Sequence, residues 1–195
     1  MNHRLAERFA TDSDFEVVEH LDQSLPTHYF PEPGPGIGRD GLLVRFSGHS
    51  RRDWLGMFAA GDISPNGVSG VFTCPDANRL CVVSSGLATY VCPNDPGIWE
   101  TVPLEPVMGV HSALPAGVLV LHDFTRFVAY GESGLLWQTP SLSWDGINSL
   151  SVKGENLEGF GWDAPSGAMV AFQVRLSDGY HVGGASPELL DAHDR

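Results

Sequence analysis

The sequence predicts an all-β protein built from antiparallel meanders, arranged as a β-sandwich or as a small propeller-like stack of sheets. Short apolar runs separated by turns fill residues 42–185. The chain has 23 Gly and 14 Pro in 195 residues, which indicates many turns and few long helices. In addition, MVAFQVRL at 169–176 alternates its side chains with the period of two that is typical of a half-buried strand.

Four segments are expected along the chain. Residues 1–30 form an N-terminal arm, and their pattern is compatible with a short helix or with a strand at 15–18. A linker, PEPGPGIGRDG, follows at 31–41, then the all-β domain at 42–185 and a C-terminal tail at 186–195. Although GIGRDG matches a dinucleotide-binding fingerprint, Pro-rich coil precedes it where a strand is needed, so no dinucleotide site is predicted.

The clearest strands of the domain are read from apolar runs and the turns between them. In chain order they are predicted at 42–46, 54–59, 118–121, 127–130, 135–137, 169–176 and 180–182. The strands from 118 to 137 form a three-strand meander. Asp178-Gly179 between the last two strands is a strong hairpin signal.

Two stretches of sequence resemble each other at a distance of 47 residues. CPDANRLCVVSSG at 74–86 and LHDFTRFVAYGESG at 121–134 both carry Asp, then Arg three residues later, then apolar residues and a Gly turn. We interpret Asp76 with Arg79 and Asp123 with Arg126 as corresponding loops, each closed by its own ion pair.

Each of these units then ends on a tryptophan, Trp99 in the first and Trp137 in the second. A looser third unit places Asp163 at the loop position. A spacing of about 40–47 residues is the size of a propeller blade. The recurrence predicts that Trp137 is a packing residue, whereas Trp144, in polar SLSWDG, is the better candidate for exposure.

Composition excludes several classes of function. The 24 acidic and 11 basic residues give a net charge of −13, so neither nucleic acid nor an anionic membrane is expected as a partner. No apolar run approaches the ~20 residues of a membrane span. The chain has three cysteines, Cys74, Cys81 and Cys92, and no two of them form a C-x-x-C pair. We expect them to be free thiols in a reduced cytoplasm.

Candidate site residues are few. An aromatic ring beside a carboxylate at a strand end can stack on a sugar, or can be a core residue followed by a turn. The predicted binding residues are Trp144, Asp145, Trp162 and Asp163, together with His122 and Asp123 in the loop after 118–121. No catalytic residue, metal site or cofactor is predicted, because there is no G-x-S-x-G or H-x-x-x-H motif. The histidines that folding can bring together are His111, His122 and His181.

The function that fits best is a soluble, non-catalytic binding or protein-interaction module with a protein or carbohydrate ligand. One alternative is a metal-dependent or carbohydrate-active enzyme with Asp123, Asp145 and Asp163 at one rim. A second alternative is an acidic inhibitor of a basic protein.

Overall fold

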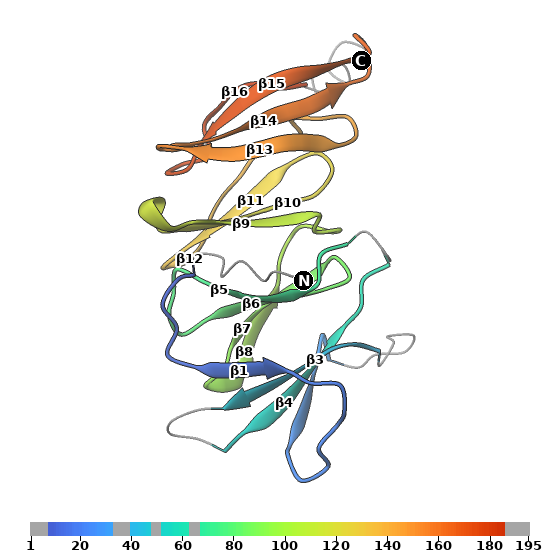
Figure 1. Ribbon diagram of the computed structural model, residues 1–195, viewed down its shortest axis with the longest axis vertical. Helices are drawn as coiled ribbons and strands as arrows, with labels where there is room; N and C mark the ends of the chain where they lie inside the picture. Colours follow the sequence, from blue (N-terminus) through green and yellow to red (C-terminus); the bar gives the residue numbers. More distant parts are fainter. Residues whose placement is uncertain (1–7, 33–39, 48–51, 63–66, 186–195) are drawn as a thin grey trace, which may run out of the picture. The chain divides into compact units, whose positions relative to one another are not determined.

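The computed structural model describes residues 8–32, 40–47, 52–62 and 67–185. These residues form sixteen strands and one three-residue 3-10 helix, and no α-helix occurs among them. The strands make four four-stranded sheets (Figure 1). The predicted all-β class is therefore confirmed. The chain divides into two compact units, Met1–Met108 and Gly109–Arg195.

The first sheet of the first unit is the only one described here that is not a simple meander. Its strands are β1 (Asp14–Val17), β2 (Thr27–Phe30), β3 (Gly41–Ser47) and β4 (Trp54–Ala59). The spatial order is β1-β3-β4-β2, with β2 parallel to β4. Strands β3 and β4 confirm the predictions at 42–46 and 54–59.

The segment that was predicted as an N-terminal arm supplies both edge strands of this sheet. Its helix alternative is wrong for the described residues, and its strand alternative at 15–18 is confirmed by β1. This segment is a strand because of contacts with distant residues: Phe15 lies opposite Phe46 in β3 and packs against the buried aromatic cluster. The predicted linker at 31–41 falls largely, and the predicted tail at 186–195 entirely, outside the described residues.

The second sheet of the first unit is an antiparallel meander in chain order. Its strands are β5 (Gly70–Thr73), β6 (Leu80–Ser84), β7 (Leu87–Cys92) and β8 (Asp95–Thr101). Aromatic side chains of the first sheet pack against aliphatic side chains of the second. Phe46 stacks on Trp54 with ring centroids 4.2 Å apart, and both belong to the same cluster as Leu80, Val82 and Val91.

The second unit contains two further meanders, each in chain order. The first comprises β9 (Gly109–Ala113), the 3-10 helix η1 (Leu114–Ala116), β10 (Val118–His122), β11 (Phe127–Gly131) and β12 (Gly134–Gln138). The second comprises β13 (Ile147–Lys153), β14 (Asn156–Asp163), β15 (Ala168–Arg175) and β16 (His181–Gly183). The predicted meander and the predicted hairpin are both confirmed. Between the two sheets lies a core that includes Val120, Phe127, Leu157, Phe172 and Val174.

The three consecutive meanders repeat with a period of about 40 residues. Their second strands begin at Leu80, Val118 and Asn156, which are 38 residues apart. Each meander thus has the size and strand number of a propeller blade. Trp99 and Trp137 both lie in the fourth strand of their meander, as the repeat predicted.

The predicted correspondence of the Asp loops is wrong. Asp76 lies between the first and second strands of its meander, whereas Asp123 lies between the second and third. Asp163, at the end of β14, occupies the same position as Asp123. Asp163, the weaker sequence match to Asp123, is thus its structural equivalent, and Asp76, the stronger match, is not. No helix among the described residues is long and apolar enough to cross a membrane.

Candidate functional site

Three segments of the second unit meet, and together they carry all the predicted site residues. The main-chain N–H of Gly146 donates to the carbonyl of Phe124 (3.0 Å), and that of Trp144 donates to the carbonyl of Trp162 (2.8 Å). The loop after β10, the loop before β13 and the end of β14 are therefore adjacent. The structure brings together His122, Asp123, Trp144, Asp145, Trp162 and Asp163, and their role in binding stays a prediction.

Two of the carboxylates in this region close their own turns. Oδ1 of Asp123 accepts the main-chain N–H groups of Thr125 (2.6 Å) and Arg126 (2.8 Å). Oδ2 of Asp163 accepts the N–H of Ser166 (3.2 Å). These are the hydrogen bonds by which Asp stabilises turns. Within the described ranges, no group of three or more His, Cys, Asp or Glu is arranged to hold a metal ion.

His122 is buried at the end of β10 and faces His111 on β9. The two rings are stacked, with centroids 5.4 Å apart and planes 21° apart. Burial lowers the pKa of His111 to about 4 and also lowers the pKa of His122. Of the three histidines considered from sequence, these two are neighbours, whereas His181 lies in β16 opposite Val174.

The two tryptophans of the segment 127–146 differ as predicted. Trp137 is only 7% exposed, and its Nε1–H donates to the carbonyl of Leu176 (2.8 Å). Its ring lies against Gly179 in the β15–β16 hairpin. Trp144 is 37% exposed. Both the packing role of Trp137 and the exposure of Trp144 are confirmed.

A second surface of this unit shares only Trp162 with the predicted binding residues. One face of the β13–β16 sheet presents apolar side chains to solvent, and we call these residues the apolar face: Phe160, Trp162, Met169, Ala171 and Val182. Phe160 is 42% and Val182 is 57% exposed. Across β14 and β15, Phe160 lies opposite Ala171 and Trp162 lies opposite Met169. The alternation in 169–176 placed Met169 and Ala171 on this side without showing that it is apolar.

At Gly161, the opposite face of β14 has no room for a side chain. A Cβ added at Gly161 would collide with the main-chain carbonyl of Leu142. Because side chains alternate along a strand, Phe160 and Trp162 then share the outward face. The tight inner contact thus accounts for the glycine there and fixes β14 against its core.

A hollow of about 420 Å³ lies on this sheet, and its lining includes Phe160, Ala171 and Val182. Lys153 and Glu158 line it as well. Lys153 Nζ lies 2.8 Å from Oε2 of Glu158, and its hydrogen bond lowers the pKa of that carboxyl. The two charges neutralise each other, so the hollow has little net charge.

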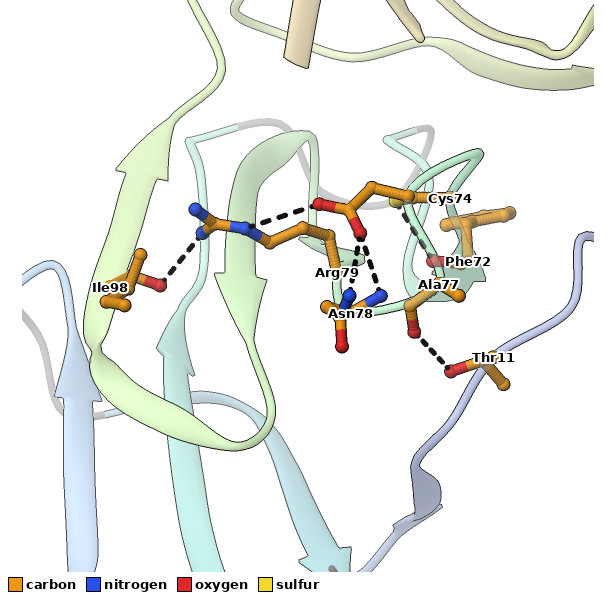
Figure 2. Close-up of polar contacts among 8 residues, drawn as sticks. Thr11, Phe72, Cys74, Ala77, Asn78, Arg79 and Ile98 are labelled. Atoms are coloured by element: carbon orange, nitrogen blue, oxygen red, sulfur yellow. Dashed lines mark hydrogen bonds and ion pairs between the residues drawn. The ribbon is translucent and has the colours of Figure 1, made fainter. Parts of the chain in front are cut away.

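In the first unit, the Asp76 turn is a structural junction (Figure 2). Arg79 extends from it, with Nε 4.0 Å from Oδ2 of Asp76 and a hydrogen bond to the carbonyl of Ile98 in β8 (3.0 Å). The hydroxyl of Thr11 donates to the carbonyl of Ala77 in the same turn (3.4 Å). The turn therefore ties the N-terminal segment and β8 to the start of β6.

The chain matches no protein-family model and no curated protein. Among solved structures it is similar to the crystal structure of the N-terminal domain of Nup159, with 11% sequence identity and a TM-score of 0.39. The alignment covers 94% of this chain and 54% of the other, so this chain spans about half the length of that domain.

Proposed function

We propose that this chain is a non-catalytic protein-interaction module, and that a protein partner binds the apolar face of the β13–β16 sheet. The observation that carries the proposal is the exposure of Phe160 on a central strand, where it lies opposite Ala171 and shares its face with Trp162 and Met169. Single apolar residues on a surface need no explanation. Apolar residues that gather on one sheet face are typical of an interaction site.

The form of this surface favours a protein over a small ligand. The apolar side chains spread over β14, β15 and β16: Phe160 lies opposite Ala171 and Trp162 opposite Met169, and Val182 lies on the same face, opposite Gln173. Small molecules are usually enclosed by a cleft, whereas protein partners cover broad faces with an apolar centre and a polar rim.

Charge favours a partner that is itself apolar at the contact. The whole chain carries a net charge of −13, yet Lys153 and Glu158 on this face compensate each other. A strongly basic partner gains little from a neutral surface. The acidic-inhibitor alternative is therefore less suited to this face than to other parts of the molecule.

A second candidate function rests on a different observation. Trp144 is 37% exposed and stands beside exposed Asp145, the combination that stacks on a sugar ring and accepts its hydroxyls.

For either function we place the protein in a reducing compartment such as the cytoplasm. The free thiols of Cys74, Cys81 and Cys92 support this placement.

The experiment is a selection of displayed random peptides on the wild-type chain, followed by affinity measurements on variants. Phe160→Ser should weaken selected peptides at least tenfold, about 1.4 kcal/mol, as expected for a central contact. The matched control is Leu135→Ser, because Leu135 on β12 is 46% exposed but belongs to another sheet. It should change affinity less than twofold.

Two outcomes would contradict the proposal. Equal effects of Phe160→Ser and Leu135→Ser would mean that the peptides bind no particular face. Loss of binding in Trp144→Ala alone would transfer the site to the loops and favour the carbohydrate alternative, which a glycan array then tests. Sedimentation of the wild type and of Phe160→Ser shows whether a second copy of the chain is the partner.

A further inference from the structure

Two histidine side chains of the β9–β12 sheet point to the same side of that sheet. His111 on β9 lies opposite Val120, and His122 on β10 lies opposite Gly109. Their rings stack at 5.4 Å. The residue opposite His122 is thus a glycine. Because Gly109 has no side chain, the two imidazole rings occupy the space on that side of β9 and β10.

The tautomer of His122 follows from its hydrogen bond. Its Nδ1 lies 2.8 Å from the carbonyl oxygen of Asp123. Because a carbonyl can only accept, Nδ1 carries the proton and donates it. In the neutral ring, Nε2 then keeps a free lone pair. In metal-binding histidines, a carbonyl or carboxylate usually accepts the proton of one ring nitrogen and so orients the other nitrogen toward the metal.

The Nε2 atoms of both rings face Gly109. A Cβ added at Gly109 would collide with Nε2 of His122 and would lie 3.2 Å from Nε2 of His111. Nε2 of His111 is buried, and no group among the described residues forms a hydrogen bond with it. A buried polar atom of this kind calls for a water or an ion.

We propose that His111 and His122 form a two-imidazole site for a divalent transition-metal ion such as Cu²⁺ or Zn²⁺. An ion bound by both rings, through metal–imidazole bonds of about 2.0–2.1 Å, would lie next to Gly109, the residue that both Nε2 atoms face. This inference is independent of the protein-binding face.

The test uses the full chain with metal alone. In a Cys92→Ser background, which removes the partly exposed thiol, Zn²⁺ titration is followed by NMR of ¹⁵N-labelled histidine. The expected result is a shift of the Nε2 resonances of His111 and His122 at one equivalent. Calorimetry with Cu²⁺, the most tightly bound ion of its series, should show at least a tenfold loss of affinity in His111→Gln and in His122→Gln. The control His28→Gln, at an exposed histidine, should change it less than twofold.

The NMR experiment needs no substitution at either histidine, so it remains decisive even when a variant fails to fold. Shifts confined to other histidines, or Cu²⁺ affinity unchanged in folded His111→Gln and His122→Gln, would overturn the inference. Either result would leave a buried water as the partner of His111.

Discussion

Replacing Trp137 by alanine should destabilise the second unit strongly. The indole is 7% exposed, and its N–H donates to the carbonyl of Leu176. Its ring also covers Gly179, where an added Cβ would lie only 2.8–3.0 Å from ring atoms. The substitution removes this packing, opens a cavity and leaves the carbonyl unpaired. Truncation of a buried aromatic side chain costs about 3–5 kcal/mol, a large part of a domain's stability.

The assay is urea denaturation followed by circular dichroism, with Trp144→Ala as the matched control. Trp144 is 37% exposed, so its loss should cost less than about 1 kcal/mol. Trp137→Phe keeps most of the apolar contact and removes the hydrogen bond, and should cost about 1–3 kcal/mol. If Trp144→Ala lowers the free energy of unfolding as much as Trp137→Ala does, the packing argument for Trp137 is refuted.

Two further predictions follow from burial and close contact. Burial raises the pKa of Cys74 and raises that of Cys81 to about 12, so at pH 8 a thiol reagent should label Cys92 rapidly in the native protein and all three thiols after denaturation; fewer than three in unreduced, denatured protein would reveal a disulfide. Gly161→Ala should lower the urea midpoint by the equivalent of about 1–3 kcal/mol, because the new methyl meets the Leu142 carbonyl, whereas Gly97→Ala, whose nearest contact is 3.3 Å, should change it little.

The part of the fold that sequence predicted is the part that local chemistry determines. Apolar side chains recur with a period of two in the sequence of β15, and buried and exposed side chains alternate with the same period in the structure. The hairpin after it is built from neighbours in sequence: Gly179 adopts φ +72, and Arg175 pairs with Asp178 at 2.6 Å. Such features need no information about distant residues.

The candidate site depended on distant pairings, and these were not predictable in the same way. His111 and His122 are eleven positions apart, and only the register of β9 with β10 makes their rings neighbours. The apolar face likewise depends on pairing, because Met169 becomes part of a patch only opposite Trp162. From one strand alone, an outward methionine is an ordinary surface residue.

The repeated Asp-x-x-Arg motif shows why a local match is a poor guide to position in a repeat. At Asp76 the carboxylate accepts the main-chain N–H of Asn78, and at Asp123 it accepts that of Thr125, two residues on in both cases. Any connection between antiparallel strands can use this turn, so the motif indicates a turn without indicating which one. A tryptophan that must fill space at the end of a blade depends on the packing of a whole sheet. The position of Trp137 in its meander was therefore predicted correctly, whereas the position of the Asp76 loop was not.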